Sequence, residues 1–237
     1  MWINTSFDFR ADARGRDPDK YSNTLREYHQ VVWSKPLPNG RTLHLVSTTP
    51  GVYLHHRSEL GEFSLSSDSI IQSFTAWKTL KHITDRFSQE QNDAFRASSY
   101  TMGGMIIFPA NKVGGKMTIN GARGCNRKIA DRFDLTLECI RRNYLGQISP
   151  LSDTLSRYSE FFDLFDNFTG YVEFFLLQDL VNLDSSSVKF FLPFDDFNNS
   201  SVPEDVDAYI EYRQYSIEFV EARNCRIAAG TNPHSTA

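Results

Sequence analysis

The sequence predicts an α+β fold, with an antiparallel sheet mainly from the N-terminal half and helices mainly from the C-terminal half. Apolar and polar residues alternate with a period of two between residues 41 and 66, which is typical of strands with one solvent-facing side. From residue 126 onward, apolar residues recur instead at helical spacing. Strands and helices that separate along the chain in this way favour α+β over a wound βαβ arrangement.

In the first half, a helix is expected from Ser22 to Trp33, followed by a turn at Asn39-Gly40. Asp68 could be a catalytic carboxylate, but it is expected instead to cap the N-terminus of a helix over residues 70–81, because aspartate accepts hydrogen bonds from the first turn. Ser88 with Gln91 predicts a capping box and a further helix. Strands are expected at residues 42–47, 52–57, 62–66, 104–108 and 116–119.

The second half is expected to be mostly helical, apart from a last strand over residues 188–192. Apolar faces at helical spacing should bury Phe162, Phe165, Phe174 and Leu177. The chain shows no linker or repeat, which favours a single domain over residues 1–237, with a disordered tail from about residue 230. The predicted helices cover residues 126–144, 150–165, 171–182 and 204–226.

Composition is that of an ordinary globular protein, with a high aromatic content of 19 Phe and 10 Tyr. The charge is uneven: residues 1–144 carry 20 Lys and Arg against 14 Asp and Glu, whereas residues 145–237 carry 5 against 15. Two interpretations follow. The halves bind each other within one fold, or the basic half presents a face to a polyanion.

The sequence argues against several classes of protein. It has no run of roughly 18 apolar residues that would span a membrane, and its first residues do not resemble a secretory signal. Its three cysteines lack the spacing of a zinc site or a disulfide framework. We therefore expect a protein of the cytoplasm that does not associate with membranes.

The densest group of candidate site residues lies at 120–132. The segment Asn120–Cys125 reads as a glycine-containing loop before a helix that starts at Asn126, and unpaired N–H groups at a helix start attract anions. Arg123 could hold a phosphate with its forked donors. In the alternative interpretation, the segment is a tight turn and Arg123 pairs with an acidic residue of the second half. The predicted ligand-binding residues are Asn120, Gly121, Arg123, Gly124, Arg127 and Lys128.

Three carboxylates along the predicted helix are candidates for chemistry. Asp131, Asp134 and Glu138 would share one helix face, where carboxylates could hold Mg²⁺ or, in the cases of Asp131 and Glu138, act as acid and base. Alternatively, Arg127 pairs with Asp131 and Arg142 with Glu138 at i, i+4 spacing. No metal site is predicted beyond this.

His55 and His56 are the other candidate bases, because histidine titrates near neutral pH. They are adjacent on a predicted strand, so their side chains should point to opposite faces and cannot readily share a metal. A structural role for each is the alternative.

Three segments carry a resemblance to a known family: YLHHRSELGEFSLSSDSI, TMGGMIIFP and GARG followed by IADRFDLTLECIRRNY. On these segments the chain resembles an uncharacterised bacterial family, a domain of unknown function, over nearly its whole length. The resemblance implies a bacterial cytoplasmic protein and carries no activity.

These observations favour a protein that binds a phosphate-bearing ligand, a nucleotide or nucleic acid, at residues 120–132. A phosphoester- or nucleotide-processing enzyme is one form of this hypothesis. The acidic second half disfavours an extended nucleic-acid surface, so a small anionic ligand is preferred. The rival is a non-catalytic protein–protein interaction module. The sequence predicts neither the oligomeric state nor a specific cofactor.

Overall fold

The computed structural model describes residues 1–46, 49 and 51–231, and it contains three strands and a larger number of helices. The strands are β1 (Leu54–Ser58), β2 (Gly61–Ser69) and β3 (Met105–Pro109). The α-helices are α1 (Arg10–Ala13), α2 (Pro18–Tyr21), α3 (Asn23–Val32), α4 (Lys81–Thr84), α5 (Gln89–Ser99), α6 (Ile119–Cys125), α7 (Phe133–Tyr144), α8 (Ser152–Leu155), α9 (Ser159–Phe162), α10 (Phe168–Phe174) and α11 (Val206–Thr231). Short 3-10 helices are η1 (Lys78–Leu80), η2 (Met102–Gly104), η3 (Val113–Gly115), η4 (Ser156–Tyr158), η5 (Asp163–Phe165) and η6 (Gln178–Leu180).

The sheet is antiparallel throughout, in the order β1-β2-β3. Leu54 pairs with Leu65 on one side of β2, and Leu65 pairs with Pro109 on the other. The β1–β2 turn closes at Gly61, whose φ of 123° is a backbone conformation that favours glycine. The α+β class predicted from the sequence is confirmed, since the strands lie within residues 54–109 and helices dominate the second half.

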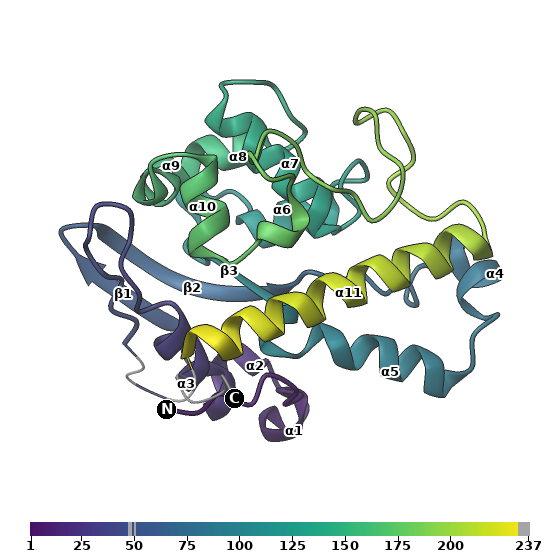
Figure 1. Ribbon diagram of the computed structural model, residues 1–237, viewed down its shortest axis with the longest axis horizontal. Helices are drawn as coiled ribbons and strands as arrows, with labels where there is room; N and C mark the ends of the chain where they lie inside the picture. The colour runs from purple at the N-terminus through teal and green to yellow at the C-terminus, as the bar shows by residue number, and fades with distance from the viewer. Residues whose placement is uncertain (47–48, 50, 232–237) are drawn as a thin grey trace.

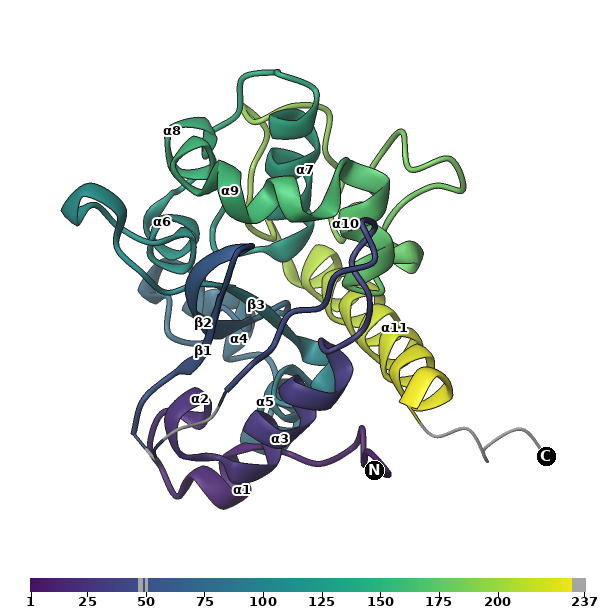
Figure 2. The same ribbon diagram turned by 90° about the vertical axis from the view of Figure 1, so that its left-hand side faces the viewer.

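The sheet lies between two groups of helices (Figure 1). Helices α6 to α10 cover one face, and α1 to α3 lie across the other, an arrangement that Figure 2 shows from the side. The long helix α11 runs past the end of β2 and packs beside α5. Strand β2 is therefore contacted from both layers, and its successive side chains point alternately to each.

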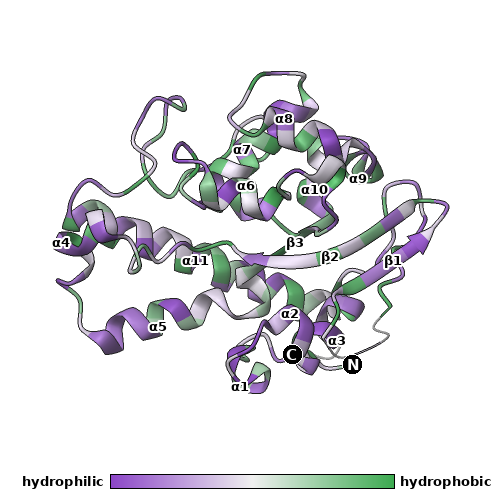
Figure 3. Ribbon diagram, turned by 180° about the vertical axis from the view of Figure 1, so that it is seen from behind, coloured by the Kyte–Doolittle hydropathy of each residue, from purple (hydrophilic) through white to green (hydrophobic). Residues whose placement is uncertain are grey.

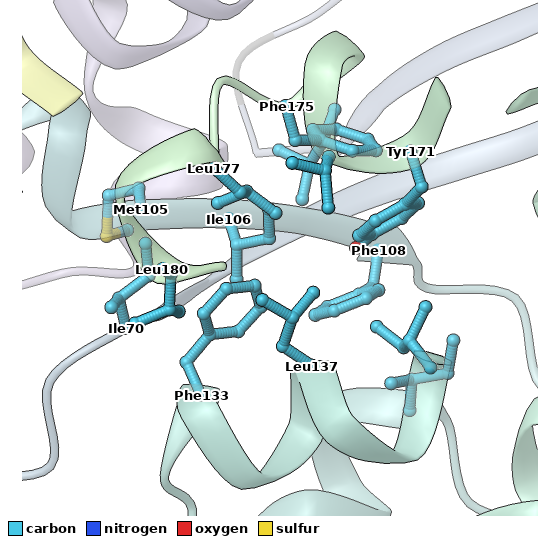
Figure 4. Packing of buried hydrophobic residues seen from close by; sticks show 14 of the residues in the cluster. Ile70, Met105, Ile106, Phe108, Phe133, Leu137, Tyr171, Phe175, Leu177 and Leu180 are labelled. Carbon is cyan, nitrogen blue, oxygen red and sulfur yellow. The ribbon is translucent and has the colours of Figure 1, made fainter. Parts of the chain in front are cut away.

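The core is aromatic-rich and centres on β3, all five residues of which are buried. A strand that is covered on both faces needs apolar side chains on both, which explains the continuous run Met-Ile-Ile-Phe-Pro. Figure 4 shows Ile106 and Phe108 of β3 facing Phe133 and Leu137 of α7, with Tyr171 of α10 above Phe108. Phe162, Phe165, Phe174 and Leu177 are each at most 4% exposed, as predicted.

Two helices start where they were predicted, and the capping box predicted for the second is confirmed. The Ser22 side chain accepts a hydrogen bond from Leu25 N at the start of α3, and Ser88 with Gln91 forms the capping box of α5. Helix α5 buries only Phe95 and Ser99 and carries a mixture of hydrophilic and hydrophobic residues (Figure 3). It is a surface helix that packs by one narrow side.

Several elements predicted for the first half are wrong. Asp68 does not cap a helix, because β2 continues to Ser69 and residues 70–77 are not helical. The predicted strand 42–47 is reduced to isolated bridges at Thr42 and Val46, and its last residue lies outside the described residues. The predicted strand 116–119 is replaced by the start of α6, with Met117 left 53% exposed.

In the second half, three of the four predicted helices are shorter or divided, whereas the one predicted over 204–226 is the long helix α11. The helix predicted from 126 begins at Phe133, and the one predicted from 150 to 165 is divided into α8, η4, α9 and η5. The predicted strand 188–192 is only a bridge between Val181 and Val188. Helix α11 includes residues 230 and 231 of the predicted tail, and residues 232–237 lie outside the described part of the chain. Across residues 1–46, 49 and 51–231, no helix combines the length and apolar character needed to cross a membrane.

Candidate functional site

The segment predicted to be an anion-binding loop is helix α6. Thr118 caps this helix, its Oγ1 accepting a hydrogen bond from Gly121 N at 3.3 Å. Neither Gly121 nor Gly124 has a positive φ, so the tight turn that the alternative interpretation required is also absent. The sequence misled because glycine is a poor helix former, whereas Thr118 and the burial of Ile119 on the core decide the outcome here.

The segment after α6 is a turn, and the helix start predicted at Asn126 does not exist. Asn126 Oδ1 accepts a hydrogen bond from Lys128 N at 2.9 Å, which closes a local turn. Ala130 and Asp131 then have positive φ values of 49° and 59°, which a helix cannot contain. The predicted combination of unpaired helix N–H groups with flexible glycines is therefore wrong at this position.

Arg123 is fully buried and hydrogen-bonded on all sides by the protein. Its Nε donates to Thr136 Oγ1 at 2.9 Å, and one terminal nitrogen donates to Asp68 Oδ2 at 2.8 Å. The other terminal nitrogen donates to the carbonyl oxygens of Ser69 and Asp131, each at 3.1 Å. These contacts join β2, α6, the 126–132 turn and α7. The carboxylate partners come from the same half of the chain, not from the acidic second half.

Asp68 and Asp131 complete this cluster, and each has a side chain that is 26% exposed. Gln72 Nε2 donates to Asp131 Oδ2 at 3.1 Å, and Asp131 Oδ1 lies 3.7 Å from the Arg123 guanidinium. Burial raises the pKa of Asp131 to about 6, although Arg123 opposes that rise. Burial likewise raises the pKa of Asp68 against the attraction of Arg123. The two carboxyl groups therefore bind protons more readily than ordinary aspartates do.

Arg127 and Lys128 lie on the outer side of the turn and line an open groove of about 630 Å³. The groove is also lined by Arg142 and Ser149, and by Asp196, Phe197 and Asn198 from the loop before α11. Within the described residues, the Arg127 guanidinium makes no ion pair and no hydrogen bond. In the described part of the chain, the hydrogen-bond partner of Lys128 Nζ is Asn198 Oδ1, at 3.5 Å. We call this feature the basic groove.

Arg142 forms one wall of the basic groove, and contacts on both sides fix its position. Its Nε donates to Glu138 Oε1 at 2.7 Å, and its guanidinium carbon lies 4.8 Å from the centre of the Phe197 ring. Glu138 also accepts two hydrogen bonds from Arg141, at 2.7 and 2.9 Å. The predicted pairing of Glu138 with Arg142 at i, i+4 is confirmed.

The acidic face predicted for Asp131, Asp134 and Glu138 does not form. Asp131 precedes α7 and pairs with Arg123 and not with Arg127, while Asp134 is fully buried and bonded to Arg132 and to Phe191 N. The helical spacing argument fails because Asp131 lies before α7 with a positive φ, so only Asp134 and Glu138 are on the helix. Among the residues that the structure describes, no group of three His, Cys, Asp or Glu side chains could hold a metal ion.

His55 and His56 point to opposite faces of β1, as predicted. His55 is partly exposed, with Nε2 3.1 Å from Glu62 Oε1 on β2. His56 is fully buried, with Nδ1 accepting from His44 N at 3.0 Å and Nε2 2.8 Å from Ser58 Oγ. Burial lowers the pKa of His56, so its neutral form is favoured. The contacts to Glu62 and Ser58 lie within the β1–β2 hairpin, and the contact to His44 joins the hairpin to the preceding segment, which is consistent with a structural role.

Comparison with known proteins gives a family and no activity. The model of the Family of unknown function (DUF6994) matches residues 3–227. The chain belongs to this family. The match includes every residue of the Arg123 cluster and of the basic groove, and it confirms the resemblance seen in the sequence. No curated protein and no solved structure matches the chain.

Within this family domain, sequence reasoning missed the partners of Arg127 and Lys128. Arg142, Ser149 and the loop at Asp196–Asn198 follow Lys128 by up to 70 positions, and only the fold brings them together. One signal was present in the sequence: Asp196, Asn198 and Asn199 form a cluster of turn-forming residues, and the side chains of Asp196 and Asn199 accept local backbone hydrogen bonds. Such a loop is a common place for ligand contacts.

Proposed function

We propose that the protein binds a small phosphate-bearing ligand in the basic groove. The observation that supports this is the pair of adjacent cations, Arg127 and Lys128, which face the groove without a carboxylate partner among the described residues. Arginine and lysine bind phosphate oxygens through charge-assisted hydrogen bonds. Arg142 adds a third positive charge, and Ser149 adds a hydroxyl group. The predicted phosphate ligand is retained, and its position moves from α6 to the turn that follows.

The groove favours a nucleotide or a similarly compact anion over a long nucleic acid. Phe197 is only 8% exposed, and its ring is covered by Arg142, so a base has little aromatic surface on which to stack. Asp196 stands at the rim and would repel an extended row of phosphates. Both features limit the ligand to a few phosphate groups.

The other predicted binding residues have a supporting role in this proposal. The Arg123 guanidinium donates a hydrogen bond to Asp131 O, and the backbone carbonyl of Arg123 accepts one from Asp131 N at 3.3 Å. These two contacts fix the turn that presents Arg127 and Lys128. Asn120 is held on β2 by a hydrogen bond to Ser66 Oγ at 3.1 Å. Gly121 and Gly124 belong to the same helix.

A phosphoester- or nucleotide-processing activity would need a proton donor or acceptor beside this turn. Asp131 is the stronger candidate, because its pKa of about 6 lies near neutral pH and its side chain is partly exposed. Glu138 is occupied by two arginines. A bacterial cytoplasmic location belongs to the same proposal, and the free thiols of Cys125 and Cys225 on the surface fit a reducing compartment.

Isothermal titration calorimetry with pyrophosphate and with ATP tests the proposed function. Arg127→Ala with Lys128→Ala should weaken binding by roughly ten- to a hundredfold, the expected effect of removing charge-assisted hydrogen bonds. The matched control replaces Lys112 and Lys116, two exposed lysines outside the groove, with alanine and should leave the affinity unchanged. Equal binding by both double variants, or no binding by the wild type at about 1 mM ligand, would contradict the proposal.

A second candidate function is docking of a protein partner, which the apolar residues beside the groove favour. Leu145 and Ile148 follow α7 and are 55% and 87% exposed, respectively. Large exposed apolar side chains next to unpaired cations are common at protein interfaces. Sedimentation of the wild type and of Ile148→Ser over a range of concentrations tests for self-association through this surface. A monomer at every concentration in both proteins counts against a homo-oligomer.

A further inference from the structure

A second cavity, of about 550 Å³, lies on the other side of the helical layer, between residues 35–38 and the start of α10. Its apolar walls include Leu37, Phe165 and Phe174, and its charged residues are Lys35, Asp166 and Glu173. This volume is in the range of small-molecule sites, which combine apolar walls with a few polar groups. None of these residues was identified from the sequence as part of a site.

Lys35 is the one basic residue that lines this cavity, and its ammonium group has no carboxylate partner within the described residues. Its Nζ donates only to the carbonyl oxygen of Glu173, at 3.4 Å, and lies 5.0 Å from the centre of the Phe174 ring. Burial, together with the nearby charge of Arg223, lowers the pKa of Lys35 to about 8. An ammonium in these surroundings lacks a counter-ion that a bound anion would supply.

A second cation strengthens this positive charge. Arg223 of α11 is fully buried and lies 5.5 Å from the Trp33 ring, while Lys35 lies 5.7 Å from the same ring. Arg223 donates to the carbonyl oxygens of Phe175, Gly103 and Met105 and forms no ion pair within the described residues. Two cations therefore lie near one indole ring, and neither has a carboxylate partner among the residues that the structure describes.

The backbone around the cavity is held in place. Pro36 and Pro38 flank Leu37, whose N–H donates to Arg41 O at 2.8 Å. On the opposite side, Asp166 has φ 61° and ψ −52°, a conformation that is unfavourable for a residue with a side chain. Gly170 admits no side chain, because a Cβ there would lie 2.1 Å from Phe165 O. The backbone that forms the walls of the cavity is thus constrained by local contacts.

We propose that this cavity, the Lys35 pocket, binds a small monocarboxylate with an apolar body. The carboxylate would lie on Lys35 Nζ, and the body would lie against Leu37, Phe165 and Phe174. A single negative charge is specified because Asp166 and Glu173 also line the pocket and would repel a phosphate dianion. This site is separate from the basic groove, with which it shares no lining residue, and does not depend on the function proposed for the groove.

Benzoate is a suitable probe, and benzyl alcohol is the matched uncharged control. Backbone amide shifts of Thr169 and Gly170, recorded by NMR, report on the pocket directly. Benzoate should produce saturable shifts below about 10 mM, and Lys35→Met should weaken its binding at least tenfold, the typical cost of losing a charge-assisted hydrogen bond. Lys112→Met, which removes an exposed lysine outside the pocket, should bind benzoate as the wild type does.

Protection from chemical modification gives a second measurement that needs no variant. Reductive methylation at pH 8 with formaldehyde and a borane reductant labels lysines, and mass spectrometry reads each site. Benzoate should slow labelling of Lys35 while leaving Lys112 and Lys116 unchanged. The proposal is overturned if benzoate gives no saturable shift, if benzyl alcohol binds equally well, if Lys35→Met binds benzoate normally, or if labelling of Lys35 is not slowed.

Discussion

Replacing Arg123 with methionine should destabilise the protein by about 3 kcal/mol or more, since removing one partner of a buried ion pair leaves the other charge uncompensated. The substitution removes four hydrogen bonds, to Thr136, Asp68, Ser69 and Asp131. Methionine preserves much of the volume of the buried side chain, so the loss is mainly electrostatic. The lower end of the 3–5 kcal/mol range is appropriate because both carboxylates are about one-quarter exposed to water.

The loss should depend on pH in a definite direction. In the wild type, burial raises the pKa of Asp68 and Asp131, and Arg123 limits the rise. Without Arg123, both pKa values rise further above the ordinary value of about 3.9. A carboxyl group whose pKa is raised by folding binds its proton more tightly in the folded state than in the unfolded state. Its contribution to the free energy of unfolding is therefore lost as pH increases through the folded-state pKa. Arg123→Met should therefore lose more stability at pH 8 than at pH 5.

Urea unfolding followed by circular dichroism at pH 5 and pH 8 measures both effects. The matched control is Arg127→Ala on the same turn, which should change the free energy of unfolding by no more than about 0.5 kcal/mol because the side chain is exposed and unpaired among the described residues. If Arg123→Met is no less stable than Arg127→Ala, or if its loss is the same at both pH values, Arg123 does not neutralise the two aspartates as described.

Three further predictions concern stability. Burial raises the pKa of Asp19 to about 7, although Ser67 donates two hydrogen bonds to its carboxylate. The free energy of unfolding should therefore fall as pH rises from 5 to 8, by at most roughly 1.4 kcal/mol per pH unit from this group. Asp19→Asn should flatten that fall, as measured by urea unfolding at each pH. Phe162→Ala, at a side chain that is 1% exposed, should cost about 3–5 kcal/mol, and an unchanged melting temperature would contradict its place in the core. Gly170→Ala should lower the melting temperature because its Cβ would meet Phe165 O, and a variant as stable as the wild type would show that the backbone moves aside.

The parts of the fold that were predictable from sequence are those that local chemistry decides. Ser22 and Ser88 marked helix starts correctly, because a cap needs only its own side chain and the next three residues. The run Met105–Pro109 was predictable as a buried strand because few other elements are both short and apolar on two faces. In both cases the determinants lie within a few residues.

Tertiary contacts override the local pattern elsewhere. Residues 126–132 contain no glycine or proline, so propensity predicts a helix, yet positive φ at Ala130 and Asp131 brings Asp131 to Arg123. Asp68 appeared as a cap because the sequence does not show that β2 continues past Ser66 to meet Arg123 from α6. Buried arginines of this kind are difficult to anticipate because arginine is usually exposed.

In the candidate sites, too, some residues could be identified from local sequence, whereas the contacts between distant segments could not. Arg127 and Lys128 were identified because two adjacent cations are visible in the sequence, but the groove that gives them a shared ligand needs the distant loop at Asp196–Asn198. Lys35 was not identified at all. A single lysine between serine and proline is unremarkable in sequence, and only the burial of Phe174 beneath it reveals a pocket.

The position of a bound tungstate ion, located by anomalous scattering in crystals of the wild-type protein, tests the central proposal most directly. Tungstate has the charge and tetrahedral shape of phosphate, so it should occupy the basic groove within hydrogen-bonding distance of Arg127 and Lys128. The same ion should be absent in crystals of the Arg127→Ala, Lys128→Ala variant. Tungstate bound elsewhere with the groove empty, or bound unchanged in the variant, would contradict a phosphate site at this turn.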